Sequence, residues 1–278
     1  MSGSLPSSGA PSLSGMEEQT VAFQLGKSGR EPAPSTGVLQ ISYHLGRLAE
    51  AMRCGELLLG YLDELIQDED LLAGIEAAVG PVKAFKTKQF RSVFEMRLYR
   101  ILLYVVLRAV KPQLAIETGV LHGLTTAFLL RALERNEYGR LISIDLPSYP
   151  HSGPSNKDGY DQVLPAGKQP GWAVNKLRHA ERWDLRLDAS TMVLPSLGQS
   201  VEGLGFFVHD SEHTFKTMWF ELDWAWERLV KGGVLVCDNI EASTAFHEYA
   251  RRVARDAMTF PAPDLHKHEC PRFALIIK

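Results

Sequence analysis

The chain has 278 residues, of which 45% are hydrophobic, so it can bury one sizeable core in a large domain with appendages. Its formal net charge is -3 and it contains no long basic run, which excludes the electrostatic surface typical of nucleic-acid-binding proteins and favours a small or neutral partner. The apolar runs are too short or too interrupted by Arg to cross a bilayer, and the 3 Cys residues are far apart, so we expect a cytoplasmic protein without a membrane partner.

The first 110 residues divide into two parts of different composition. Residues 1–36 are rich in Ser, Gly and Pro, and their apolar residues are too scattered to offset the entropy lost on ordering. We therefore expect a flexible tail there. Within residues 37–110, the stretches 39–66 and 90–110 repeat apolar residues at three- and four-residue spacing. This pattern predicts helices with one buried face, which would form an N-terminal helical layer.

Residues 111–278 contain short apolar strands that alternate with amphipathic helices. The predicted strands are 114–120, 140–146, 183–189, 205–210 and 232–240. Near-continuous apolar strands of this kind are typical of a parallel sheet covered on both faces. We therefore predict an α/β fold with a doubly wound, mostly parallel, Rossmann-like sheet. Residues 257–260 and 272–278 are joined by a loop too short for a crossover helix, which predicts an antiparallel pair at the C-terminal edge of the sheet.

Polar residues follow every predicted strand. In an open parallel sheet, ligands bind beyond the carboxyl ends of the strands, so these residues are the candidates for a site. In chain order they are Glu117, Gly119, Gly123 and Thr125; Asp145; Asp188, Ala189 and Ser190; Asp210 and His213; and Asp238 and Asn239. One such residue alone is usually a helix cap, but their joint occurrence at the strand ends indicates ligand-binding chemistry.

The glycine-containing turn after the first strand separates two classes of cofactor. A dinucleotide site has the motif G-x-G-x-x-G, whose backbone amides hold a pyrophosphate. This chain instead has an acidic residue first, in the pattern Glu117-x-Gly119-x-x-x-Gly123. The turn therefore disfavours a pyrophosphate and favours a ligand with an ammonium group, while Asp145 could accept hydrogen bonds from two ribose hydroxyls. Whether His122 in this turn contacts a ligand stays open.

The motif E-x-G-x-x-x-G, together with an acidic residue ending the second strand, resembles the class I methyltransferases that use S-adenosylmethionine (SAM). The segments "HDSEH" and "LVKGGVLVCDNI" resemble the metal-dependent O-methyltransferases related to catechol O-methyltransferase and to the macrolide-sugar enzymes. The resemblance covers roughly residues 90–278. It implies that residues 111–278 form a catalytic domain, in which the candidates after the first three strands bind SAM.

The same resemblance assigns roles to the candidates after the last two parallel strands. It implies that Asp210, Asp238 and Asn239 bind magnesium, and that His213 stands where the catechol enzyme has a lysine base. Mg²⁺ prefers oxygen ligands and could lower the pKa of an acceptor hydroxyl, while His213 would remove its proton. We therefore expect an O-methyltransferase for a hydroxylated small molecule, with sugar-containing or polyketide-like natural products favoured over catechols.

Other interpretations remain open at this point. Asp238 and Asn239 could simply cap the helix that follows them, and His213 could be a structural histidine hydrogen-bonded to Asp210 or to the backbone. The chain could also be a non-catalytic SAM-binding partner module, or an oxidoreductase that uses NAD. A homo-oligomer is compatible with the sequence. The long loop 147–171 is either a lid over cofactor and substrate or a disordered insert.

Overall fold

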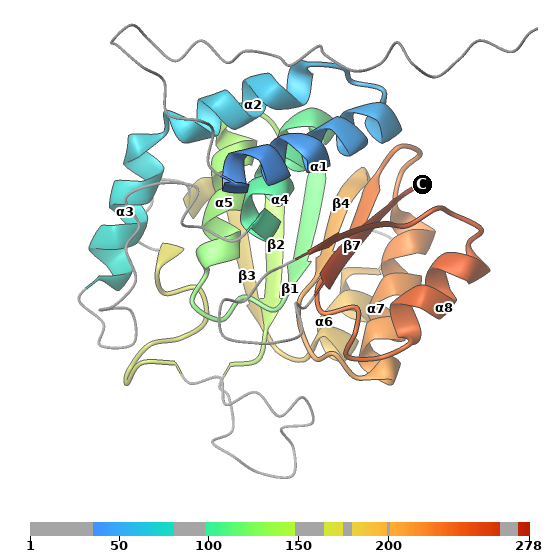
Figure 1. Ribbon diagram of the computed structural model, residues 1–278. Helices are drawn as coiled ribbons and strands as arrows, with labels where there is room; N and C mark the ends of the chain where they lie inside the picture. The colour runs from blue at the N-terminus through green and yellow to red at the C-terminus, as the bar shows by residue number, and fades with distance from the viewer. Residues whose placement is uncertain (1–35, 81–97, 148–163, 175–179, 199–200, 262–271) are drawn as a thin grey trace, which may run out of the picture. The chain divides into compact units, whose positions relative to one another are not determined.

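A seven-stranded sheet carries the fold, with the strand order β3-β2-β1-β4-β5-β7-β6 (Figure 1). The strands are β1 (Leu114–Thr118), β2 (Arg140–Asp145), β3 (Trp183–Leu187), β4 (Leu204–His209), β5 (Val234–Cys237), β6 (Met258–Pro261) and β7 (Arg272–Ile277). β1 to β5 pair in parallel, whereas β7 lies antiparallel between β5 and β6. The predicted doubly wound sheet is confirmed, and so is the antiparallel pair at its edge, with β6 as the outermost strand.

The computed structural model describes residues 36–80, 98–147, 164–174, 180–198, 201–261 and 272–278. The expected tail up to residue 35 and most of the long loop therefore lie outside the described residues. Ser35–Lys278 form one compact unit, in which the N-terminal helices and the sheet share a hydrophobic core. Among the described helices, none is both long enough and apolar enough to cross a membrane.

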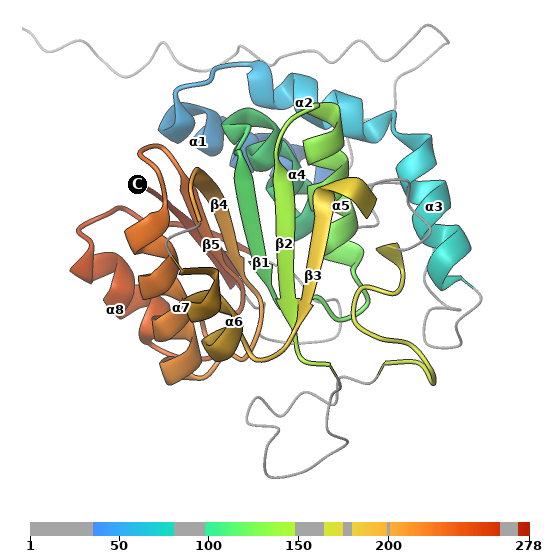
Figure 2. The same ribbon diagram turned by 180° about the vertical axis from the view of Figure 1, so that it is seen from behind.

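Helices cover the two faces of the sheet (Figure 1 and Figure 2). One layer contains α1 (Thr36–Met52), α2 (Leu57–Ile66), α3 (Glu69–Val79), α4 (Leu98–Val110) and α5 (Leu124–Arg135), and the other contains α6 (Ser190–Leu197), α7 (Phe215–Arg228) and α8 (Ala245–Arg252). The strands supply both cores by alternation, since Ala115 of β1 packs in the α4–α5 core while Leu114 and Ile116 pack in the α6–α8 core. This two-sided burial explains why the parallel strands are apolar at nearly every position.

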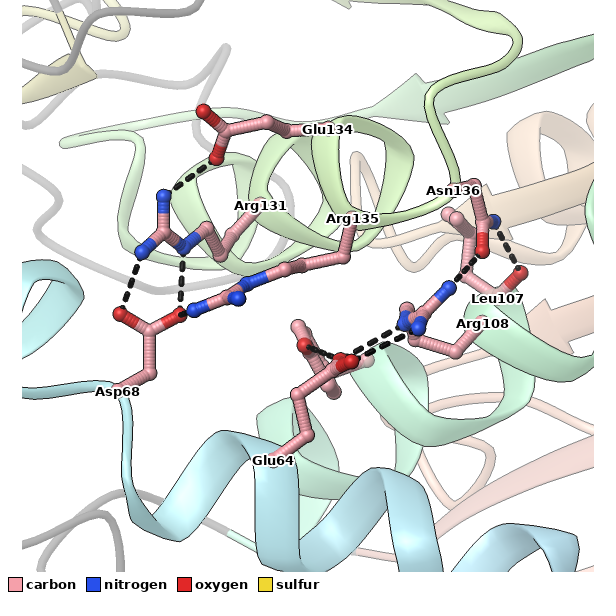
Figure 3. A network of polar contacts seen from close by, with 9 residues as sticks. Glu64, Asp68, Leu107, Arg108, Arg131, Glu134, Arg135 and Asn136 are labelled. Carbon is pink, nitrogen blue, oxygen red and sulfur yellow. Dashed lines mark hydrogen bonds and ion pairs between the residues drawn. The ribbon is translucent and has the colours of Figure 1, made fainter.

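A partly buried polar network joins α2 and α3 to α4 and α5 (Figure 3). Arg108 of α4 donates two hydrogen bonds of 2.8 Å to the Glu64 carboxylate, which also accepts one from the Tyr104 hydroxyl. Arg131 of α5 donates two to Asp68, which in turn caps α3 by accepting a hydrogen bond of 3.1 Å from the Leu71 amide. These charge-assisted pairs fix how the N-terminal helices dock on the sheet layer.

Arg131 and Arg135 provide a matched test of this network, because both bind Asp68 from α5. Arg131 binds through two nitrogens with a side chain 13% exposed, whereas Arg135 makes one contact of 3.2 Å and is 40% exposed. Arg131→Met should lower the free energy of unfolding by about 2–4 kcal/mol, since it leaves the buried Asp68 charge poorly paired. Arg135→Met should cost less than about 1 kcal/mol. Urea unfolding of both variants measures the difference, and equal losses would contradict the assignment.

Candidate active site

Four acidic side chains gather where the parallel strands end: Glu117, Asp145, Asp210 and Asp238. The hydrogen bonds between neighbouring strands continue past the strand ends. The Asp210 amide donates to the Thr118 carbonyl, and the Asp238 amide donates to the His209 carbonyl, each at 2.9 Å. Val208 and Val236 face the α4–α5 layer, so Asp210 and Asp238, two positions further on, face it as well. Strand geometry therefore turns these carboxylates toward one space beneath α4 and α5.

Glu117 is fully buried on this face and only half satisfied. Its Oε2 accepts hydrogen bonds of 2.8 Å from the hydroxyls of Thr126 and Ser143. Among the described residues, its Oε1 has no hydrogen-bond partner. Burial outweighs the two hydrogen bonds and, with the nearby Asp145 charge, raises the pKa of Glu117 to about 7. An ammonium group would supply the missing donor and the opposite charge, so Glu117 fits the ligand predicted for it.

The two glycines of the turn adopt backbone conformations that other residues rarely adopt. Gly119 and Gly123 have φ angles of 83° and 87°, a region that favours glycine. A Cβ on Gly119 would overlap the backbone oxygen of Asp210, so this glycine allows the turn to lie against the end of β4. Thr125 is buried in the first turn of α5, directly behind the turn.

Asp145 holds the glycine turn in place. Its Oδ2 accepts hydrogen bonds from the backbone amides of Val120 and Leu121, at 2.7 and 2.8 Å, and its Oδ1 accepts one of 2.7 Å from the Leu146 amide. The sequence identified Asp145 only as a ribose ligand and missed this structural role. A contact to backbone amides leaves no residue pattern at its partners, so no signal in the sequence could have revealed it.

His122 in the glycine turn contacts the side chain of Trp172. Its Nδ1 accepts a hydrogen bond of 3.0 Å from the Trp172 indole, and the segment around Trp172 bonds to the turn through the Gly171 amide and the Leu121 carbonyl, at 2.8 Å. The C-terminal end of the long loop 147–171 therefore packs on the glycine turn. Residues 148–163 of that loop lie outside the described residues.

The candidates after β3 are Asp188, Ala189 and Ser190, and their hydrogen bonds run to the backbone and to α7. Asp188 is exposed, and its Oδ1 accepts a hydrogen bond of 2.7 Å from the Ala189 amide at the start of α6. Ser190 donates its side-chain hydrogen bond to Glu221 of α7. Glu221 also binds the Ser211 hydroxyl, so Ser190 is linked through Glu221 to the segment that carries Asp210.

Asp210 and Asp238 form a close pair of like charge. Their side chains share a hydrogen bond, and burial together with the Asp238 charge raises the pKa of Asp210 well above its usual value. Asn239 follows directly, in a left-handed conformation with φ of 50°. Within the described ranges, no three His, Cys, Asp or Glu side chains meet as a metal site, and the Asn239 oxygen is the candidate for a third ligand beside Asp210 and Asp238. Two adjacent carboxylates, one of which has a raised pKa, fit a cation such as Mg²⁺.

His213 lies beside this pair, as its spacing predicts. Its Nε2 is 3.9 Å from Asp210 Oδ1, and its ring meets the edge of the His209 ring with centroids 5.5 Å apart. A neutral imidazole in this position can accept a proton close to the carboxylates.

The opposite face of the sheet holds a network that the sequence did not reveal. Glu221 of α7 is fully buried and binds the His209 ring at 2.6 Å, the Ser211 hydroxyl at 2.7 Å and the Thr118 hydroxyl. Burial alone would raise the pKa of Glu221, but the charge and hydrogen bonds of these partners lower it. The network ties β1, β4 and α7 together and thereby fixes the segment that carries Asp210. Only the helical position of Glu221, on a face of otherwise apolar residues, could have indicated it.

The first turn of α4 also reaches this sheet edge, which sequence reasoning missed. Only three residues join α4 to β1, so the helix runs back across the sheet and begins near the carboxyl ends of the strands. The Arg100 charge acts on Asp210 and on Glu117, and in both cases it lowers the carboxyl pKa. One cationic side chain from α4 therefore partly offsets the acidic cluster.

Part of the chain matches a known protein domain, and the fold is similar to that of several solved structures. Residues 116–240 match a family model described as a methyltransferase domain, and no curated protein matches the sequence. The O-methyltransferase TomG from Streptomyces achromogenes, involved in Tomaymycin synthesis and solved with SAM, is 16% identical, with a TM-score of 0.53 over 81% of this chain and 96% of that chain. An O-methyltransferase from Bacillus cereus with S-adenosylhomocysteine (SAH) is 15% identical, with a TM-score of 0.51 over 80% and 100%. SAH-bound PaMTH1 from Podospora anserina is 11% identical, with a TM-score of 0.50 over 90% and 99%.

These likenesses establish the Rossmann-like methyltransferase fold. Together with the matched domain, they support a class I methyltransferase that uses SAM.

Glu117 should make the ligand-free protein less stable as the pH rises. Its ordinary pKa is 4.5 and its folded pKa is about 7, so between these values the folded state binds more protons than the unfolded state and stability falls with increasing pH. Glu117→Gln should therefore raise the free energy of unfolding at pH 8 by about 2–3 kcal/mol, with little change at pH 4, while weakening SAM binding. Urea unfolding at both pH values measures this, with Glu76→Gln on the exposed side of α3 as the control. A loss of stability at pH 8 would show that the Glu117 charge is compensated in the ligand-free protein.

Proposed function

We propose that this protein transfers the methyl group of SAM to a hydroxyl of a small molecule. The observation that carries the proposal is the half-satisfied Glu117 beside the Asp210–Asp238 pair, within a segment that matches a methyltransferase domain. Transfer to oxygen is supported by TomG and the Bacillus cereus protein, which are both O-methyltransferases. The domain match favours this function over an oxidoreductase that uses NAD.

The residues of the glycine turn and of β2 would bind the cofactor. Glu117 Oε1 would accept a hydrogen bond from the ammonium group, and Gly119 allows close approach of the backbone. Asp145 would bind the ribose hydroxyls through the acceptor positions of its carboxylate that the backbone amides do not use. Residues 188–190 would border the base, next to β3.

Asp210, Asp238 and Asn239 would hold Mg²⁺ through oxygen atoms, as this ion prefers. When bound, the ion would orient the acceptor and lower the pKa of its hydroxyl. His213 Nε2, which lies 3.9 Å from Asp210, would accept the hydroxyl proton as the oxygen attacks the methyl group. The Glu221 network would keep the segment from His209 to Ser211 in position while this happens.

We infer that the acceptor is a hydroxylated natural product, with sugar-containing or polyketide-like compounds as the first to test. The part that TomG plays in Tomaymycin synthesis supports such a role.

Metal binding can be tested without knowing the acceptor. Mn²⁺, a paramagnetic stand-in for Mg²⁺, should bind the protein with its cofactor, and Asp238→Asn should weaken this binding roughly ten-fold or more because one charged ligand is lost. Asp223→Asn, at the outer side of α7 where it binds Arg252, should leave it unchanged. Titration followed by electron paramagnetic resonance gives both values. Equal Mn²⁺ binding by all three proteins would reject the metal site, and SAM turnover unaffected by EDTA would reject the metal requirement.

The role of His213 can be tested once a turned-over acceptor is found in a panel of hydroxylated compounds. His213→Ala should keep SAM and Mn²⁺ binding but lose about 10²-fold or more in turnover, as removal of a general base typically does. His247→Ala, on the exposed side of α8, is the matched control. Turnover near that of the unaltered protein would mean that His213 is structural. SAM binding without turnover of any compound would instead favour a non-catalytic partner module.

A further inference from the structure

Tyr99 lies in the first turn of α4, at the same sheet edge as the acidic cluster. Its ring meets the Phe273 ring edge-on, with centroids 5.0 Å apart. Phe273 precedes Ala274, which pairs with Cys237 across the antiparallel ladder, so Phe273 is level with Asp238. Phe273 also belongs to the core on the α4–α5 face. These contacts place Tyr99 on the same face of the sheet as Asp238, at the same position along the strands.

The hydroxyl of Tyr99 is buried and has no hydrogen-bond partner among the described residues. The residue is 3% exposed. Buried hydroxyls in folded proteins nearly always find a partner, because leaving one unpaired costs free energy. Tyr104, five residues further along the same helix, follows that rule, since its hydroxyl donates to Glu64.

The surroundings of Tyr99 select a cationic partner. Burial, followed by the charges of Asp210, Asp238 and Glu117, raises the pKa of Tyr99 well above its usual value, so the phenol stays neutral. Among the described residues, Glu117 Oε1 on the same face is the other buried side-chain oxygen without a hydrogen-bond partner. A ligand group that donates to both oxygens needs at least two polar hydrogens, and the acidic neighbours favour one that is positively charged.

We propose that the Tyr99 hydroxyl and Glu117 Oε1 together bind the α-ammonium group of SAM, so that α4 contributes directly to the cofactor site. This inference rests on the proposed function, because it assigns a further residue to the same site. The ammonium group has three N–H donors, of which Glu117 accepts one and the Tyr99 oxygen accepts another. The acidic motif would thus recognise the amino-acid end of the cofactor together with a residue eighteen positions earlier in the chain.

Two ligands separate this role from a general effect on the site. SAH carries the amino-acid end, whereas 5′-methylthioadenosine lacks it and keeps the nucleoside. Tyr99→Phe should weaken SAH binding about ten-fold, the usual effect of losing one hydrogen bond to a charged group, and should change methylthioadenosine binding less than about two-fold. Calorimetry measures both affinities. Tyr104→Phe, which removes a hydroxyl from the same helix, should leave both unchanged.

The ligand-free variants provide an independent readout. Because the Tyr99 hydroxyl lacks a partner, Tyr99→Phe should leave the melting temperature equal or higher, while Tyr104→Phe should lower it. The inference is overturned if Tyr99→Phe binds SAH as the unaltered protein does, if it weakens both ligands equally, or if it melts at a clearly lower temperature. If the unaltered protein binds neither ligand, the proposed function itself fails, which is a different result from a failure of Tyr99 alone.

Discussion

The burial of several carboxylates at one sheet edge is the constraint on which the rest of this structure depends. Parallel strands bring Glu117, Asp145, Asp210 and Asp238 to this edge, where Glu117, Asp145 and Asp238 are buried and the Asp210 side chain is 28% exposed. Like charges in such a place are costly unless each finds compensation. Asp145 obtains it from backbone amides, whereas Asp210 and Asp238 share a hydrogen bond. These acidic residues still lack enough positive charge nearby. The sheet edge therefore suits a cationic cofactor and a metal ion.

Glu117 and Glu221 show how partners decide the function of a buried carboxylate. Both are fully buried, on opposite faces of the same sheet. Glu221 accepts hydrogen bonds at both oxygens and its pKa is lowered, whereas Glu117 is half satisfied and its pKa is raised to about 7. The satisfied carboxylate stabilises the protein alone, so it belongs to the scaffold. The unsatisfied one makes the ligand-free protein less stable, a cost that is understandable only if a ligand removes it.

Local patterns predicted the features that depend on local geometry. The strands, the turn of Gly119 and Gly123 and the pairing of β6 with β7 follow from residue periodicity and backbone preference, and the structure confirms them. Contacts between elements were out of reach. The docking of α4, which brings Tyr99 to the site, and the hydrogen bonds of Glu221 depend on how helices pack on a sheet, and no spacing in the sequence encodes those angles.

Helix α4 connects the two polar regions of the molecule. Its first turn carries Tyr99 and Arg100 beside the acidic cluster, and its last turn carries Arg108, which binds Glu64 through two nitrogens. A helix is stiff along its axis, so anchoring its far end fixes the position of its first turn. The N-terminal helices, although distant from the carboxylates in sequence, are then part of the site through α4. Their buried ion pairs limit how far the helix can shift on the sheet, and therefore how far Tyr99 can move from Glu117.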